Sequence, residues 1–140
     1  MYQISLIPKD QLHTIIPLLR ILNDAIDERT LQERLEDMQQ RNYVCAGVYD
    51  QQRLIGICGL WILNKYYVGK HIEPDNVMIL PEYRSKGVGE QMMEWVYEYG
   101  RSQGCIASEL NCYVTNDKGI RFWLNQGYRI IGFHCQKKLL

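Results

Sequence analysis

The residues of this chain with the clearest chemical potential are two glycines and two basic side chains that follow an apolar stretch. Residues 77–89, VMILPEYRSKGVG, read as a strand and a loop that carries Arg84, Lys86, Gly87 and Gly89. In a strand–loop–helix unit, unpaired N–H groups of the first helical turn and the helix dipole attract anions, and glycine lets a phosphate approach the backbone. The segment therefore predicts a phosphate-binding loop in preference to a plain turn.

The spacing of this loop disfavours two common nucleotide sites. It does not match G-x-x-x-x-G-K-[ST], and it does not match G-x-G-x-x-G with a downstream acidic residue. The sequence thus disfavours a Walker-type or Rossmann-type site.

Two motifs resemble those of the GNAT N-acetyltransferase superfamily. The pattern R-x-x-G-x-G from Arg84 to Gly89 resembles the family's acyl-CoA signature, R/Q-x-x-G-x-G/A. The pattern N-x-x-G-x-x-F-W-x-x-x-G-Y from Asn116 to Tyr128 is similar to its N-x-x-A-x-x-F-Y-x-x-x-G-F block. One helix and one strand separate the motifs, and the preceding element order also fits, so the resemblance covers nearly the whole chain.

The resemblance implies acetyl-CoA as acyl donor, with its pyrophosphate on the loop amides. The pantetheine arm would run along the preceding strand like an added strand, where family members splay two neighbouring strands. Asn116 matches the asparagine that touches the pantetheine end, and it also fits an N-cap of the following helix. The cofactor-binding set implied is Val77, Met78, Ile79, Arg84, Ser85, Lys86, Gly87, Val88, Gly89, Glu90, Asn116 and Trp123.

A general base is expected on strand 71–80, because an alkylamine with a pKa of about 10 must lose a proton before it attacks a thioester. His71, Glu73 and Asp75 alternate onto one face of a regular strand. Glu73 lies eleven residues before Arg84, the offset of the catalytic glutamate in the histone-acetylating branch, so it ranks first, Asp75 second and His71 third. Pro74 favours a bend or an end here, and solvated edge residues are the alternative.

The chain departs from the family pattern at the expected acid. Trp123 replaces the tyrosine that protonates the leaving thiolate in many members, and an indole N–H has no useful acidity. Asn111 stands where another branch has a glutamate five residues before Asn116. Tyr113 and Tyr128 are nearby alternatives. We expect Trp123 to pack beside the pantetheine arm, and the thiolate to leave unprotonated or to take its proton from water or the incoming ammonium.

Residues near the acceptor are less specific. Residues 24–37 carry an excess of four negative charges, which would favour a cationic amine if they border a groove; a solvated helix face is the alternative. Trp61, Tyr66, Tyr67 and Tyr83 are candidates for the acceptor site, for strand packing or for a dimer surface.

Hydrophobic periodicity predicts the elements that position these residues. The expected strands are residues 2–7, 43–49, 53–63, 71–80, 106–114 and 128–138. A first helix opens with Asp10 as N-cap, and a second, at about 30–40, opens with a capping box from Thr30 to Glu33. Further helices are expected at 90–102 and 116–125. The order β-α-α-β-β-β-α-β-α-β predicts an α/β fold, a single GNAT-like domain over residues 1–140 with a central mixed, mostly antiparallel sheet flanked by helices.

Composition excludes several classes of protein. The 140 residues hold 16 basic and 16 acidic side chains, which argues against a dedicated nucleic-acid binder. The five cysteines are odd in number and form no C-x-x-C pair, so neither a disulfide framework nor a zinc site is expected, and no metal is. No signal-peptide pattern or long apolar run occurs, which predicts a cytoplasmic protein without membrane contact. Cys45, Cys58 and Cys112 fall in apolar strands and are expected to be inert.

The sequence therefore predicts an acetyltransferase that moves an acetyl group from acetyl-CoA to a primary amine of a small molecule by direct attack on the thioester. One alternative acceptor is a peptide or protein amine. Another reading is a non-catalytic acyl-CoA-binding regulatory module, and a third is a nucleotide-binding protein in which ATP or NAD competes with CoA. A homodimer is compatible with all of them.

Overall fold

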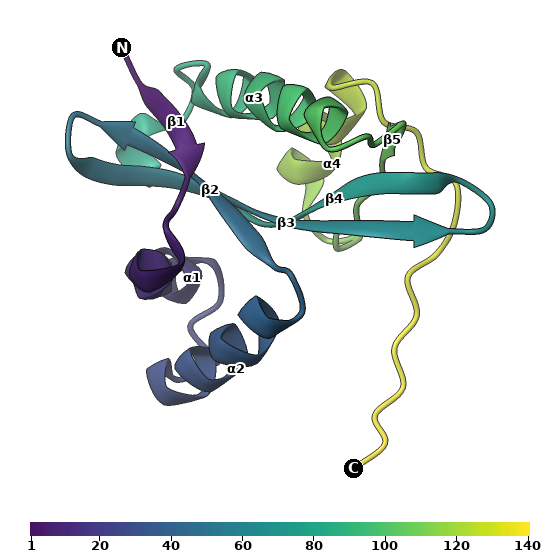
Figure 1. The fold of residues 1–140 in the computed structure, drawn as a ribbon, viewed down its shortest axis with the longest axis horizontal. Helices are drawn as coiled ribbons and strands as arrows, with labels where there is room; N and C mark the ends of the chain where they lie inside the picture. The colour runs from purple at the N-terminus through teal and green to yellow at the C-terminus, as the bar shows by residue number, and fades with distance from the viewer.

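A five-stranded sheet crosses the molecule in the order β1-β2-β3-β4-β5 (Figure 1). The computed structural model describes all 140 residues. The strands are Gln3–Leu6, Val44–Asp50, Arg53–Lys65, Gly69–Ile79 and Ala107–Ser108. Neighbours pair antiparallel except β4 and β5, which are parallel. The predicted class, an α/β fold with a mixed, mostly antiparallel sheet, is confirmed.

Helices lie on both sides of this sheet, with α1 and α2 on one side and α3 on the other (Figure 1). The 3₁₀ segments η1 and η2 span Lys9–Ile15 and Pro81–Tyr83. The α-helices α1 to α4 span Ile16–Leu22, Glu28–Gln40, Val88–Ser102 and Asp117–Asn125. No helix is both long enough and apolar enough to cross a bilayer.

Two predicted helix starts are wrong. Helix α2 begins at Glu28, and its N-cap is Asp27, whose Oδ1 accepts the Thr30 N–H at 2.8 Å. Thr30 therefore sits in the first turn, because the earlier carboxylate already caps it. Asp10 likewise lies inside η1, which begins directly after Pro8.

The core joins the faces of β2, β3 and β4 to one stripe of α3. Met92, Met93 and Val96 of α3 are fully buried, as their helical spacing predicts. Gly100 lets the same helix approach β4, because a Cβ there would lie 3.0 Å from Cγ2 of Ile72. Helix α3 is thus held against the strand on which the candidate base was expected.

Strand β4 continues through Pro74, which pairs with Leu60 of β3, so Pro74 does not end the strand predicted at 71–80. The carbonyls of Lys70 and Ile72 accept N–H groups from the β5 segment. Backbone groups alternate along a strand with a period of two, so the nitrogen of Pro74 also points to the β5 side of β4. Strand β5 has already ended at this level, so the missing N–H of the proline costs no hydrogen bond between strands.

A β-bulge follows in β4. Gly59 of β3 opposes Asp75 while Ile57 opposes Met78, so two residues of β4 face Cys58, and Asn76 takes a φ of 50°. A bulge of this kind re-aims the following side chains.

Two predicted strands do not form as expected. The segment 106–114 is a strand only at Ala107–Ser108, and 128–138 has no regular structure. The strand signal of both is apolar alternation, but a strand forms only where its backbone pairs with a neighbouring edge, and neither 109–114 nor 128–138 makes such a pairing. Residues 129–140 are exposed and run away from the body of the molecule (Figure 1).

Candidate active site

The loop between β4 and α3 has the geometry of a cradle for an anion. Ser85 and Gly87 adopt left-handed conformations, with φ of 60° and 79°, which turn successive N–H groups towards one concavity. Gly87 precedes α3 without any side-chain cap, and Gln91 is the first residue of the turn whose N–H has a backbone acceptor, the Gly87 carbonyl. The N–H groups of Val88, Gly89 and Glu90 are thus left for a ligand.

A pocket of about 440 Å³ opens over this cradle. Its lining residues are Ile79, Tyr83, Arg84, Ser85, Gly87, Val88, Gly89, Glu90 and Phe122. A Cβ at Gly87 would meet nothing within 4 Å, so any side chain there would project into open space at the pocket. A Cβ at Gly89 would lie 3.1 Å from the Phe122 ring, so this glycine lets α4 pack against the start of α3.

The basic residues of the loop differ in their availability. The Arg84 guanidinium donates to the Ile79 carbonyl at 2.9 Å and contacts the Met78 sulfur at 3.5 Å, so it braces the loop against β4. The Lys86 ammonium lies 5.8 Å from the centre of the Tyr83 ring and forms no ion pair. Lys86 is therefore the loop cation that a phosphate can recruit.

Beyond its first residues β4 has a free edge. Its pairing with β5 ends at Ile72–Ser108, after which the two segments diverge as a splay. Leu80 donates its N–H to Ile55 of β3, so by the period of two Met78 also turns its backbone to β3. Val77 and Ile79 then turn their backbone groups to the free edge, where Arg84 already occupies the Ile79 carbonyl, whereas the backbone groups of Met78 face β3.

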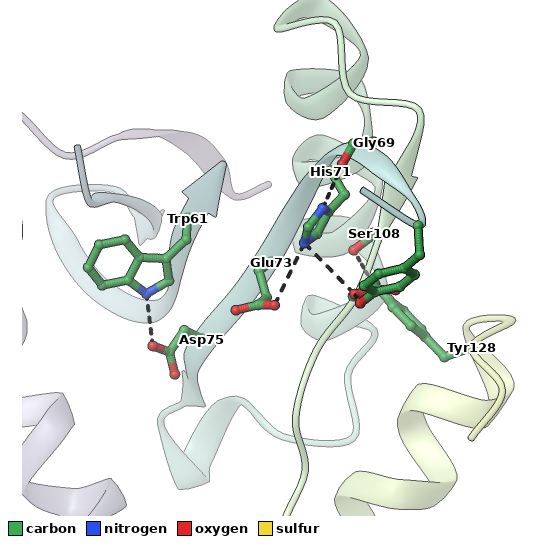
Figure 2. Close-up of polar contacts among 9 residues, drawn as sticks. Trp61, Gly69, His71, Glu73, Asp75, Ser108 and Tyr128 are labelled. Atoms are coloured by element: carbon green, nitrogen blue, oxygen red, sulfur yellow. Dashed lines mark hydrogen bonds and ion pairs between the residues drawn. The ribbon is translucent and has the colours of Figure 1, made fainter. Parts of the chain in front are cut away.

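A buried histidine and two carboxylates meet where the strands diverge (Figure 2). His71 Nε2 lies 3.8 Å from Oε1 of Glu73 on β4 and 3.8 Å from Oε1 of Glu109, which follows β5. The His71 side chain is fully buried, and the two glutamates are about 20% exposed. Tyr67 donates its hydroxyl to Glu109 at 2.5 Å. This group, His71, Glu73, Glu109 and Tyr67, is called the splay cluster below.

The splay cluster is built to hold positive charge. His71 Nδ1 lies 3.0 Å from the Gly69 carbonyl, which can only accept, so Nδ1 carries a hydrogen. Nε2 has no hydrogen-bond partner and points at two anionic oxygens. The three ligand atoms lie within 4.8 Å of one another, close enough to hold one divalent cation between them.

Asp75, the second candidate base, has a different environment (Figure 2). Its Oδ2 accepts the Trp61 indole N–H at 3.0 Å, and its Oδ1 accepts the Asn76 N–H at 2.9 Å. Tyr43 donates to Asn76 at 2.9 Å and packs its ring against Trp61. Asp75 thus fixes the bulge and the indole, and it lies outside the splay cluster.

Asn116 and Trp123 occupy structural positions on α4. Asn116 accepts the Gly119 N–H at 3.0 Å, so it is the N-cap that the sequence allowed. Trp123 is half-buried and packs edge-on against Phe122 and Tyr128. Its indole N–H forms no hydrogen bond, which fits a packing role.

Of the two alternative hydroxyl acids, only Tyr128 is near the site. Tyr113 is 82% exposed. The Tyr128 hydroxyl lies 2.6 Å from Ser108 Oγ at the end of β5, and burial raises the pKa of this phenol (Figure 2). A raised pKa makes Tyr128 a weaker proton donor at neutral pH.

The acidic stretch 24–37 forms a solvated helix surface. Arg29 pairs with Glu33, and Arg41 pairs with Asp37, both one turn apart on exposed side chains of α2. Among the aromatic candidates, Trp61 and Tyr67 contact Asp75 and Glu109, Tyr83 lines the loop pocket, and Tyr66 is fully exposed.

Sequence reasoning missed Glu109. A signal was present, because Glu109 is an acidic residue inside the apolar stretch 106–114, two positions before Asn111. Residues two apart share a strand face, so Glu109 places a carboxylate on the same face as position 111, where another branch of the family has a glutamate.

Known proteins match this chain over most of its length. The model of the acetyltransferase (GNAT) family matches residues 12–128. The N-acetyltransferase YhdJ of Bacillus subtilis is 22% identical over 135 residues, which cover 95% of each chain. Glucosamine 6-phosphate N-acetyltransferase of Trypanosoma brucei brucei is 29% identical over 102 residues, 68% of this chain and 66% of that protein.

The fold is shared with solved acetyltransferases. The aminoglycoside N-acetyltransferase AAC(6')-Iy, solved in complex with a bisubstrate analogue of CoA and acetylneamine, is 18% identical and superposes with a TM-score of 0.80 over 98% of this chain and 99% of that one. The chain belongs to the acetyltransferase (GNAT) family.

Proposed function

We propose that this protein transfers an acetyl group from acetyl-CoA to the primary amine of a small molecule. One observation carries the proposal: the anion cradle at residues 84–90, the free edge of β4 and the splay cluster follow one another along a single strand. This order matches that of a donor that has phosphates at one end and a reactive thioester at the other. Matching relatives named for glucosamine 6-phosphate and for aminoalkylphosphonate support a small amine as acceptor.

The cradle fits the phosphate end of such a donor. Backbone N–H groups of Val88, Gly89 and Glu90, the helix dipole of α3 and the Lys86 ammonium would hold the diphosphate. The backbone groups of Val77 and the N–H of Ile79 would pair with the amides of the pantetheine arm as a strand edge pairs with a peptide. The donor, when bound, supplies an activated acetyl thioester.

Glu73 is proposed as the base, acting directly or through a water. Its carboxylate takes one proton from the acceptor ammonium, and the amine lone pair then attacks the thioester carbon. The new C–N bond forms as the C–S bond breaks, and the sulfur leaves with the electron pair. His71 lies behind Glu73 and Glu109 as a positioning residue whose Nε2 faces both carboxylates.

The leaving sulfur has no dedicated acid in this proposal. Trp123 cannot serve, and the Tyr128 hydroxyl is engaged by Ser108. The thiolate takes its proton from water or from the attacking nitrogen, and rate enhancement rests mainly on proximity and orientation.

A non-catalytic acyl-CoA-binding module is the rival function, favoured by the indole at position 123. The test compares CoA binding by calorimetry with thiol release from acetyl-CoA over a panel of small amines and one lysine-containing peptide. We expect both binding and amine-dependent thiol release, fastest with a small amine. Binding without turnover on any amine would establish the rival, the best rate on the peptide would make the acceptor a protein amine, and displacement of CoA by ATP or NAD would indicate a nucleotide site.

The compartment is proposed from the thiols. All five cysteines are free, and Cys45 and Cys58 are buried, which fits a reducing cytoplasm.

A further inference from the structure

The His71 side chain is fully buried, yet its Nε2 atom has no hydrogen-bond partner. The other ring nitrogen, Nδ1, donates to the Gly69 carbonyl at 3.0 Å, so the neutral ring carries its lone pair on Nε2. A buried polar atom without a partner destabilises the fold. Nε2 points at the carboxylates of Glu73 and Glu109, so a partner for it must enter between these two groups (Figure 2).

The two carboxylates bring more negative charge to this point than one proton can balance. The ion pairs of Glu73 and Glu109 are both with His71, and neither carboxylate pairs with a lysine or an arginine. A proton on Nε2 would leave one negative charge in a mostly buried place, whereas a divalent cation would leave none. Uncompensated buried charge is costly, so the charge of the cluster favours a divalent cation.

The spacing of the three ligand atoms suits a small transition-metal ion. Nε2 of His71 lies 3.8 Å from Oε1 of Glu73 and 3.8 Å from Oε1 of Glu109. In a tetrahedral zinc site with bonds of about 2.1 Å, neighbouring ligand atoms lie about 3.4 Å apart, so each pair need only close by about 0.4 Å. Both glutamates are partly exposed, which gives an ion a path from solvent and leaves the fourth position open.

The backbone and the outer contacts already hold these ligands in place. His71 and Glu73 are two residues apart on β4 and share a face, and the Glu109 N–H donates to the Ile72 carbonyl at 3.1 Å. Histidines that bind metals usually donate their other ring N–H to an oxygen, and carboxylates that bind metals are themselves hydrogen-bonded. Both contacts are present here, from Nδ1 to a backbone carbonyl and from the Tyr67 hydroxyl to Glu109.

We propose that the splay cluster binds one divalent transition-metal ion of the zinc type, through Nε2 of His71 and one carboxylate oxygen each of Glu73 and Glu109. The imidazole ligand selects such an ion over Mg²⁺ and Ca²⁺, which take oxygen ligands. Glu109 follows Glu73 by 36 residues, so no short spacing in the sequence predicts this set of ligands.

An ion at this point switches the acetyl transfer off, and this consequence rests on the proposed function. Glu73 is the proposed base, and a carboxylate oxygen that is bound to zinc cannot take a proton from the acceptor ammonium. Zinc and the ammonium therefore compete for the same carboxylates. Metal binding itself is measured without activity, so its failure and the failure of the acetyltransferase proposal are distinguishable.

The first experiment measures the affinity of the full chain for Zn²⁺ by competition with a chromogenic chelator, with Mg²⁺ as the comparison ion. We expect Zn²⁺ to bind far more tightly than Mg²⁺. Glu109→Gln should weaken zinc binding roughly 100-fold or more, and Tyr67→Phe, which removes only an outer contact, roughly 10-fold. Asp75→Asn removes a carboxylate of the same strand outside the cluster and should bind zinc like wild type.

His71→Ala should also lose zinc binding, and circular dichroism checks that it folds. The Glu109→Gln result decides the matter if His71→Ala does not fold, because Glu109 is partly exposed and glutamine has the same size. Zinc affinity that is unchanged in Glu109→Gln, or equal affinities for Zn²⁺ and Mg²⁺, would overturn the proposal.

The second experiment identifies the ligands from the absorption spectrum of the Co²⁺ form. Nitrogen and oxygen ligands give weak visible bands, whereas a thiolate adds an intense charge-transfer band in the near ultraviolet. We expect no thiolate band, and the same spectrum in His134→Ala/Cys135→Ser, which removes an exposed histidine and an exposed cysteine. A thiolate band, or a spectrum that is lost in this double variant, would place the ion on the cysteines.

The third experiment tests the switch by measuring the acetylated amine with mass spectrometry, because zinc also binds the free thiol of CoA. We expect Zn²⁺ to inhibit wild type and a chelator to restore it. Glu109→Gln keeps the proposed base, so its remaining activity should need roughly 100-fold more zinc for equal inhibition. Acetylation that continues with zinc bound at the cluster would overturn the switch, whereas zinc binding without acetylation of any amine would support the metal site and contradict the proposed function.

Discussion

At Asp75 both carboxylate oxygens accept hydrogen bonds, one from Trp61 and one from Asn76, whereas Glu73 faces His71 and Glu109. The two carboxylates lie on one strand, two residues apart, and sequence alone ranks them only by their offset from the loop. The bulge separates them, because it turns Asp75 towards the indole. A carboxylate with both oxygens occupied is poorly placed to receive a substrate proton, so the structure favours Glu73 as the base.

Replacement of the proposed base gives the first prediction. Glu73→Gln should lower kcat by roughly 10²-fold or more, the usual contribution of a general base, and should flatten the acidic limb of the pH–rate profile. The affinity for acetyl-CoA should change little, because the cradle is untouched. Asp75→Asn is the matched control and should keep most of the rate. Equal activity of Glu73→Gln and wild type, with a large loss in Asp75→Asn, would transfer the role to Asp75.

A second prediction concerns Trp123. The indole packs on Phe122 and Tyr128, so Trp123→Phe should retain most activity, while Trp123→Ala should weaken cofactor binding and cost about 1–3 kcal/mol of stability, less than a fully buried Trp would. Trp123→Tyr should raise kcat modestly if a missing acid limits the rate. Steady-state rates on one amine and urea unfolding measure these effects. A large loss of kcat in Trp123→Phe with intact binding would show that the indole N–H takes part in the reaction.

Among the elements, the loop before α3 allows the sharpest test. In Gly87→Val a branched side chain would enter the pocket, and the left-handed backbone would be strained by about 1–2 kcal/mol. We expect CoA binding to be lost while the protein stays folded, since a Cβ at this position meets no neighbour within 4 Å. Calorimetric titration with CoA and circular dichroism check the two halves of this prediction.

Arg84→Ala is the companion variant. It removes the loop's braced cation but none of the cradle's N–H groups, so it should weaken CoA binding less than Gly87→Val does. Unchanged affinity in Gly87→Val, or a greater loss in Arg84→Ala, would place the diphosphate elsewhere.

The long elements could be predicted from the sequence because their pattern and their packing agree. The stripe Met92, Met93 and Val96 of α3 and the apolar runs of β2 to β4 are buried as expected. Helix starts were misplaced because Asp27 and Thr30 are both good caps, and only the geometry shows which one is used. The segments 106–114 and 128–138 have strand patterns, but alternation does not reveal whether a partner edge exists.

The candidate site was predictable in part for a similar reason. The loop motif depends on residues close in sequence, so its cradle could be located from spacing. The splay cluster depends on β4 and β5 meeting across 36 residues, and Glu109 was therefore overlooked although Glu73 was named. The bulge at Asn76 could not be predicted from the sequence either, because it depends on the register between β4 and β3.

For the molecule as a whole, buried acids predict a loss of stability in alkali. Burial raises the pKa of the Cys45 thiol from 9.0 to about 12, and burial also raises the pKa of Cys58 and of Tyr43. The neutral forms are favoured by folding, so this stability is complete below pH 9 and is lost as the pH rises through 12. In that window the titration of Cys45 should lower the free energy of unfolding by about 1.4 kcal/mol per pH unit.

Urea unfolding between pH 7 and pH 11 measures this slope. Cys45→Ala should be less stable at neutral pH, from lost packing, but should show a shallower decline above pH 9. An identical slope in the two proteins would mean that Cys45 does not titrate with unfolding.

The exposed C-terminal segment, residues 129–140, also determines where the chain is vulnerable to proteases. Arg129, Lys137 and Lys138 are exposed cleavage sites for a trypsin-like enzyme, on a backbone that forms no hydrogen bonds. A single cut after Arg129 would leave the cradle and the splay cluster intact, and it would remove the apolar side chains that this segment exposes to water. Cleavage would therefore shorten the chain without loss of its folded body.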